Sequence, residues 1–341
     1  MRNLFDTRPK SSRGELYDRE DELKFLDRVV DRPLIVVLGI RRIGKTSLLK
    51  AFLEPYNGIY IDLRGAGTHI ELYERLSEGI SSGLGKLRRF LEGIRGISIM
   101  GVSVSIKWRG QDSISLLGLL EELNRRGRFI VVFDEAQEVK PVLSAELRRV
   151  IAYSYDNLGN ITIVLSGSQI GLMENFMGLG NVNSPLFGRY AVRLVVSRFT
   201  GDQSREFLTI GFREAGVQPP VDVLEEAVAF FDGIPGWLVH FGRSYVDGIM
   251  DMGEIKERAV SIAMSELSRL SRRERAVLKA IANGAVTWGS ARRLAEEYLG
   301  ETIPKSTLTR IVNKLEALSI IKDYKFLDNV YMEAAKQLKL T

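Results

Sequence analysis

The feature that most restricts how this chain can fold is a glycine-bounded loop between an apolar run and an amphipathic segment. Residues 34–38 (LIVVL) predict a buried strand, and residues 46–53 predict a helix. The loop GIRRIGKT, from Gly39 to Thr46, matches the pattern G-x-x-x-x-G-K-[ST] at every fixed position. A strand, this loop and a helix in succession predict a site for a phosphate chain, although a turn can match the pattern by chance.

The loop has the chemistry that a polyanion requires. Glycines at its two ends permit close approach of the backbone, so that successive N–H groups and the helix N-terminus face phosphate oxygens. Lys45 would place its charge between the β- and γ-phosphates, and the Thr46 hydroxyl would ligate Mg²⁺. The predicted nucleotide-binding residues here are Gly39, Ile40, Arg41, Arg42, Ile43, Gly44, Lys45, Thr46 and Ser47.

Length and composition limit the classes of protein that the chain can belong to. A chain of 341 residues is expected to form two or three domains. The absence of cysteine excludes disulfides and thiolate chemistry, and two histidines make a zinc site improbable. No apolar run is long enough to span a bilayer, and the first residues lack the apolar region of a secretory signal, so we expect a cytoplasmic protein.

The net charge is concentrated near the end of the chain. Residues 265–341 carry 14 Lys and Arg against 9 Asp and Glu, which accounts for the whole formal charge of +5. This distribution predicts a separate C-terminal module with an anionic partner, although a solvated basic surface would look the same.

Strand and helix patterns alternate through the first part of the chain. Apolar runs at 58–63, 129–133, 161–165 and 190–196 alternate with helical patterns, including one long helix at 70–90. This order predicts an α/β fold with a mostly parallel, doubly wound sheet. We expect an N-terminal arm at 1–14 and an α/β domain at 15–198, with a β-hairpin insertion at about 93–108 centred on Gly101.

The strand pattern ends near residue 199. Four helices, at 202–215, 221–231, 236–249 and 254–267, predict a helical lid domain at 199–268. Three further helices, at 272–282, 290–298 and 305–318, precede two short strand patterns at 320–326 and 329–333. Three helices followed by a hairpin predict a winged helix-turn-helix domain at 269–341.

A second set of candidate residues follows the buried strands of the α/β part. In FIVVFDEAQ, Asp134 would hold Mg²⁺ through water, and Glu135 would orient and deprotonate an attacking water. A polar strand end with a helix cap is the alternative. Ser168 ends the next strand and could contact the γ-phosphate or the water; Ser166 competes for this role, and a simple turn is the alternative.

Arg189 belongs to the sequence SPLFGR, which leads into the fifth strand. An arginine there could reach a phosphate in a neighbouring subunit and stabilise transition-state charge. A structural ion pair is the alternative.

The order of these motifs resembles the archaeal ATPase family of AAA+-type P-loop proteins, close to the STAND regulatory ATPases. The matching segments are LYDRE (16–20), GIRRIGKT, FIVVFDEAQ, LSGS (165–168), SPLFGR, GIPGW (233–237) and the terminal winged helix. The resemblance covers nearly the whole chain and implies ATP or ADP as ligand.

The resemblance also implies residues near adenine. LYDRE resembles a box that lies near the base, which implicates Tyr17 and Arg19, although Asp18 stands where the box usually has glycine. Pro235 resembles the proline of the lid motif that packs on adenine; a plain helix start is the alternative. The winged-helix histidine that contacts the β-phosphate in some relatives has no counterpart, since no histidine follows His240.

The winged helix has two interpretations, a DNA-binding module or an interdomain packing module with a solvated face. Polar and basic residues on its third helix and its wing would face double-stranded DNA. These candidates are Lys305, Ser306, Thr309, Arg310, Asn313, Lys322 and Lys325.

The chain therefore predicts an ATPase in which Mg·ATP lies between the α/β domain and the lid. Water would attack the γ-phosphorus, with Glu135 as base and Lys45, Mg²⁺ and Arg189 stabilising charge. Hydrolysis would move the lid and the winged helix. A slow nucleotide switch and a DNA-bound initiator-like ATPase are the alternatives, an oligomer or a protein partner stays open, and GTP is not excluded.

Overall fold

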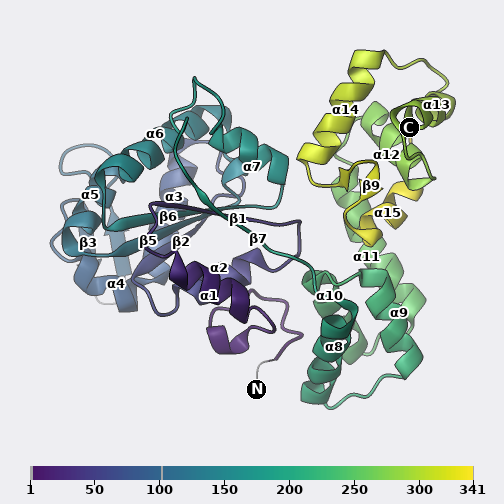
Figure 1. Cartoon of the computed structure of the whole chain (residues 1–341). Helices are drawn as coiled ribbons and strands as arrows, with labels where there is room; N and C mark the ends of the chain where they lie inside the picture. Colours follow the sequence, from purple (N-terminus) through teal and green to yellow (C-terminus); the bar gives the residue numbers. More distant parts are fainter. Residues whose placement is uncertain (1–2, 101–102, 341) are drawn as a thin grey trace.

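A five-stranded parallel sheet forms the centre of the larger part of the molecule (Figure 1). The computed structural model describes residues 3–100 and 103–340. The strand order is β2-β5-β6-β1-β7, and every neighbouring pair is parallel. The strands are β1 (Leu34–Leu38), β2 (Gly58–Asp62), β5 (Phe129–Asp134), β6 (Ile161–Gly167) and β7 (Val192–Val195). This confirms the predicted α/β fold.

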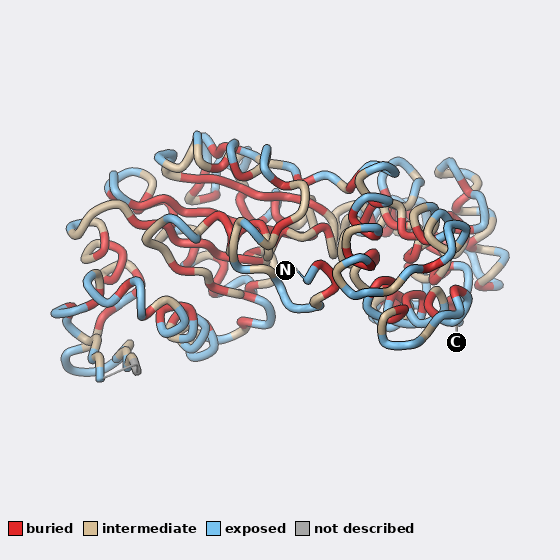
Figure 2. Tube along the Cα trace, turned by 90° about the horizontal axis from the view of Figure 1, so that it is seen from below, coloured by how far each residue is buried: buried red, intermediate tan, exposed pale blue. Residues whose placement is uncertain are grey.

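The apolar runs form strands that are buried on both faces. Every residue of β1, β5 and β6 is buried. Figure 2 shows long buried stretches in the interior of the molecule. Alternate side chains enter two cores, one under α1 (Glu20–Arg28) and α2 (Lys45–Leu53), the other under helices of the opposite face. Those helices are α3 (His69–Ser82), α4 (Leu84–Leu91), α5 (Leu116–Arg126), α6 (Pro141–Asn157) and α7 (Ile170–Met177).

The prediction of one long helix at 70–90 is wrong, because the chain breaks at Gly83 into α3 and α4. Gly83 serves as C-cap of the first helix and N-cap of the second, and the Leu87 side chain lies 2.8 Å from where its Cβ would stand. The predicted hairpin is confirmed as β3 (Ile97–Met100) and β4 (Ser103–Ile106). Its expected centre, Gly101, lies outside the described residues.

The lid and winged-helix segments form the helical remainder (Figure 1). The four predicted lid helices are present as α8 (Gly201–Ala215), α9 (Val221–Phe231), α10 (Pro235–Val246) and α11 (Met252–Leu267). The next three are α12 (Arg272–Ala282), α13 (Trp288–Leu299) and α14 (Lys305–Ala317). One continuous apolar core runs through both segments, so the boundary near 268 stays a prediction.

The strand predicted at 329–333 is wrong, because these residues begin helix α15 (Asn329–Lys336). Asp328 is the N-cap, and its carboxylate accepts hydrogen bonds from the backbone N–H of Val330 (2.8 Å) and Tyr331 (3.4 Å). The wing is instead the short hairpin of β8 (Ile321–Lys322) and β9 (Lys325–Phe326).

The expected N-terminal arm is more closely packed than its polar sequence indicates. Leu4 and Phe5 are 2% and 4% exposed and belong to the lid core. Among the described residues, no helix has the length and apolar character required to cross a membrane.

Candidate functional site

The glycine-bounded loop follows β1 and ends at the N-terminus of α2. Gly44 is the N-cap of α2 and has φ +96°, a left-handed conformation that a side chain would strain. Lys45 is 5% exposed, and its Nζ donates to the carbonyls of Gly39 (2.8 Å) and Ile40 (3.1 Å). Burial lowers the pKa of Lys45, and the nearby carboxylates of Glu135 and Asp134 oppose that shift.

Asp134, at the end of β5, gathers hydroxyl groups from three other elements. The Thr46 Oγ1 donates to its carboxylate at 2.8 Å, and the hydroxyls of Tyr60 and Ser166 donate to it as well. Burial and this carboxylate raise the pKa of Tyr60, which therefore stays a neutral donor. Mg²⁺ binds oxygen ligands, and a carboxylate beside a threonine hydroxyl can provide some of them, so these residues fit the predicted metal.

Glu135 is held beside Asp134 by a second serine. Its φ of +53° lies in the left-handed region, an uncommon conformation that is concentrated at functional sites. The Glu135 carboxylate accepts hydrogen bonds from the Ser168 N–H (3.0 Å), the Ser168 hydroxyl (2.7 Å) and the Gln137 amide (2.6 Å). The sequence left Ser166 and Ser168 as alternatives for one role. In the structure each contacts a different carboxylate: Ser166 contacts Asp134, and Ser168 contacts Glu135.

The lid contacts the loop directly through its GIPGW segment. Pro235 is the first residue of α10, and the next N–H, that of Gly236, donates to the Arg42 carbonyl at 2.9 Å. The Arg42 guanidinium lies 4.1 Å from the centre of the Trp237 ring, a cation–π contact.

The two loop arginines also meet an acid on the last lid helix, a pairing that sequence patterns did not indicate. The Glu266 carboxylate accepts from Arg41 (3.0 Å) and Arg42 (2.6 Å), and the Tyr331 hydroxyl of the winged helix donates to it. Burial raises the pKa of Glu266, but the hydrogen bonds from Arg42 and Tyr331, together with the charges of Arg42 and Arg41, lower it, and the net direction is downward. We call Arg41, Arg42, Glu266 and Tyr331 the junction cluster.

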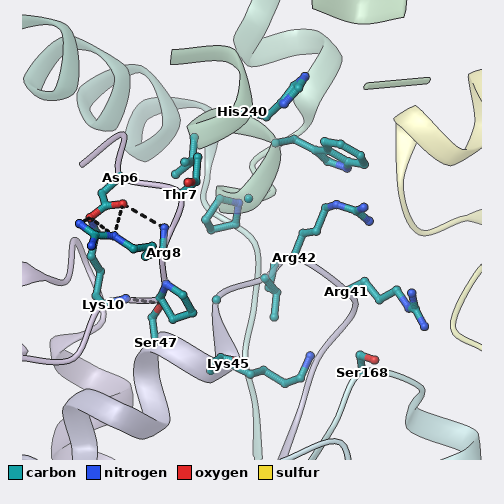
Figure 3. Close-up of a pocket in the computed structure, with 18 of the residues that line it drawn as sticks. Asp6, Thr7, Arg8, Lys10, Arg41, Arg42, Lys45, Ser47, Ser168 and His240 are labelled. Atoms are coloured by element: carbon teal, nitrogen blue, oxygen red, sulfur yellow. Dashed lines mark hydrogen bonds and ion pairs between the residues drawn. The ribbon is translucent and has the colours of Figure 1, made fainter. Parts of the chain in front are cut away.

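A cavity of about 570 Å³ lies between these elements (Figure 3). Tyr17, Arg19 and Pro235 line it, together with Lys45, Thr46, Glu135 and Ser168. In Figure 3 Lys45 and Ser168 lie on the loop side of the cavity, and His240 lies on the lid side. Asp18 has φ +49°, so it keeps the left-handed conformation that a glycine would adopt there.

One wall of the cavity was missed by sequence analysis. The arm residues Asp6 to Lys10 line it, and Figure 3 shows Thr7 close to the lid helix that carries His240. The apolar pair Leu4-Phe5 within a polar stretch was the signal that could have indicated an anchored arm.

Other candidates lie outside the cavity. Arg189 is ion-paired with Asp156 on α6, with its Nε 3.1 Å from the carboxylate, and it does not line the cavity of its own chain. The seven candidate DNA contacts are exposed on α14 and the wing.

The sequence of residues 16–241 matches the profile of the ATPase domain found predominantly in Archaea. The chain belongs to this family. Residues 270–331 match the C-terminal winged helix-turn-helix domain of MCM proteins. No curated protein sequence matches the chain.

Solved structures agree with this assignment. The Walker-type ATPase paby2304 of Pyrococcus abyssi is 36% identical, with 97% of this chain and 99% of that chain covered and a TM-score of 0.84. The ORC2 protein of Aeropyrum pernix in its ADP form is 16% identical, covers 94% and 90%, and has a TM-score of 0.55. Cdc6p from Pyrobaculum aerophilum is 17% identical, covers 99% and 98%, and has a TM-score of 0.50, so these two show the fold alone.

The chain is therefore an ATPase of a family found predominantly in Archaea, and it carries a C-terminal winged helix. Membership of this family implies that it binds nucleotide. The fold, the family and the general activity predicted from the sequence are confirmed. The roles of individual residues stay predictions.

Proposed function

We propose that the cavity binds ATP with its triphosphate on residues 39–47 and hydrolyses it there, with Glu135 as the general base. The observation that supports this proposal most strongly is the convergence of Lys45 and Thr46, at the start of α2, and Glu135, just after β5, on one cavity. The buried Asp134 lies behind them and accepts a hydrogen bond from Thr46. Tyr17, Arg19 and Pro235 line its remainder and are assigned to the base side.

Each residue has a distinct task in this scheme. Lys45 binds the β- and γ-phosphates and offsets the charge that develops in the transition state. Glu135 positions the attacking water and accepts its proton, while Ser168 fixes the carboxylate. Thr46 and Asp134 would hold Mg²⁺, which when bound would neutralise phosphate charge.

We assign the coupling of nucleotide state to domain movement to the junction cluster. Arg41 and Arg42 belong to the phosphate-binding loop, yet their partner Glu266 is on the lid and Tyr331 is on the winged helix. A γ-phosphate competes with Glu266 for the same guanidinium groups. Binding and loss of the γ-phosphate therefore change the contacts of the lid and of the winged helix.

The decisive test replaces Glu135 by Gln, which preserves shape but removes the base. Equilibrium binding of ATP is expected to stay close to the parental value, while turnover falls about 100-fold or more. Glu138→Gln is the matched control, since Glu138 also lines the cavity but follows the acidic pair. Parental turnover in Glu135→Gln would show that the base is assigned to the wrong residue.

A second candidate function, DNA binding, is favoured by one observation. Five candidate residues of α14 and two of the wing are all exposed, and they form a polar and basic surface. Arg310→Glu and Lys322→Glu should weaken binding to double-stranded DNA in fluorescence anisotropy, with affinity falling steeply as salt rises. Lys339→Glu, outside both elements, is the control; no binding at low salt, or equal loss in the control, would contradict this function.

Arg189 is retained as a candidate for action in another subunit. It does not line its own cavity, so it can reach a nucleotide only across an interface between two copies of the chain. Sedimentation should then show a larger species with a non-hydrolysable ATP analogue that Arg189→Ala does not form. A monomer under both conditions would exclude this role.

A further inference from the structure

The N-terminal arm connects the lid to the α/β part across the cavity. At its start, the Leu4 N–H donates to the Glu214 carboxylate on α8 at 3.0 Å, and Phe5 is buried in the lid core. At its end, the Lys10 N–H donates to Ser47 Oγ on α2 at 3.1 Å. The residues between these two attachments, from Asp6 to Pro9, line the cavity.

The lid contains a slot that fits the ring of Phe5. A Cβ added at Gly211 on α8 or at Gly242 on α10 would overlap this ring, so the absence of both side chains makes the slot. The ring centres of Phe207 and Phe212 lie 6.0 and 4.9 Å from that of Phe5, in edge-to-face geometry.

The other end of the arm is also attached by several hydrogen bonds. The Arg13 N–H donates to the Glu54 carboxylate at 2.7 Å, and the Arg13 guanidinium forms two hydrogen bonds with Asp27 at 2.6 and 2.8 Å. These contacts attach the arm to α1 and the end of α2, the helix whose N-terminus faces the phosphate site. The arm is thus held by both of the parts that enclose the nucleotide.

We propose that Phe5 is a positioning residue for the nucleotide: its insertion between Gly211 and Gly242 holds residues 6–10 against the cavity and slows nucleotide release. This inference rests on the proposed function, because it assumes that nucleotide occupies the cavity. A segment fixed at both ends has lost conformational freedom before the ligand binds. The binding free energy therefore does not have to offset the entropy cost of ordering that segment. Phe5 lies in the lid core and is not among the residues that line the cavity, so we expect it to change the residence time of the nucleotide and not the rate of the chemical step.

The test measures dissociation of a fluorescent ATP analogue from the full chain by stopped flow. Phe5→Ala should accelerate dissociation about tenfold, the factor that corresponds to about 1.4 kcal/mol of lost preorganisation. KM should rise, while the single-turnover rate at saturation stays parental. Phe5→Leu, which refills much of the slot, should restore most of the residence time.

Two further variants separate this role from general weakening of the lid. Gly242→Ala, which obstructs the slot, should accelerate dissociation like Phe5→Ala, and the double variant should show no additional effect because both disrupt one contact. Phe231 is another buried ring of the same core, and its aromatic partners are Phe230 and Phe241. Phe231→Ala should therefore leave the dissociation rate of the nucleotide unchanged.

Parental dissociation in Phe5→Ala, or equal acceleration in Phe231→Ala, would overturn the positioning role. Failure of the parental chain to bind the analogue would instead contradict the nucleotide site itself.

Discussion

Lys45 is the residue whose environment best indicates its task. Its ammonium group is buried, and carbonyl oxygens of its own loop accept its hydrogen bonds. Burial lowers its pKa, so the site disfavours the charge that phosphates would stabilise. A triphosphate in contact with Lys45 would therefore replace neutral acceptors by charged ones, which form stronger hydrogen bonds.

Lys45→Ala should weaken ATP binding about 10- to 100-fold, because a charge-assisted hydrogen bond in a water-poor site is lost. Titration calorimetry measures this directly. Lys50→Ala, five residues along α2, is the control and should bind as the parent does. Unchanged affinity in Lys45→Ala would mean that the phosphates lie elsewhere.

Helix α15 shows how an element can be assigned wrongly when its start depends on distant residues. Its Asp328 cap also accepts a hydrogen bond from the Trp237 indole at 2.8 Å, a residue 91 positions earlier. Asp328 is buried, and burial raises its pKa. The element therefore joins the winged helix to the lid motif that contacts the phosphate-binding loop.

Asp328→Ala should lower the free energy of unfolding by about 1–3 kcal/mol, since it removes a helix cap and leaves the buried Trp237 N–H without this acceptor. Urea denaturation monitored by tryptophan fluorescence provides the measurement. Asp323→Ala, an exposed aspartate of the wing turn, should change stability much less. Equal effects of the two changes would contradict the capping role.

Elements governed by local patterns were predictable, and contacts between distant segments were not. The strand of residues 34–38 and the helix of residues 170–177 follow from apolar patterns alone. The loop motif located Lys45 and Thr46, and the acidic strand end located Asp134. By contrast, Glu266 is one of many helix carboxylates, and only the packing of the lid on the loop gives it a partner.

For the whole molecule, the junction cluster is where the α/β part, the lid and the winged helix meet. The winged helix also contacts the α/β part at α7, where the Ile170 N–H donates to the Ser319 hydroxyl at 2.8 Å. The chain lacks the winged-helix histidine of some relatives, but Tyr331 connects the winged helix to the loop instead. Its hydroxyl accepts a hydrogen bond from Arg42, which a nucleotide would also contact. We therefore propose that this arginine couples the nucleotide to the winged helix.

Glu266→Gln should cost about 1–3 kcal/mol of stability at neutral pH, because it replaces a charge-assisted partner of two arginines by a neutral one. The folded state lowers the pKa of Glu266, so its contribution is present above about 4.5, the ordinary glutamate value, and disappears as the pH falls below it. Thermal unfolding at pH 7 and pH 4 measures both effects. A pH-independent difference would contradict the ionised cluster.

The most direct test of the account is a crystal structure of the chain with Mg²⁺ and a non-hydrolysable ATP analogue. We expect the phosphates on the backbone of residues 39–46, with Lys45 turned from the carbonyls of Gly39 and Ile40 onto the β- and γ-phosphates, and Glu135 facing the γ-phosphate. Nucleotide bound elsewhere, or a triphosphate distant from both Lys45 and Glu135, would contradict it.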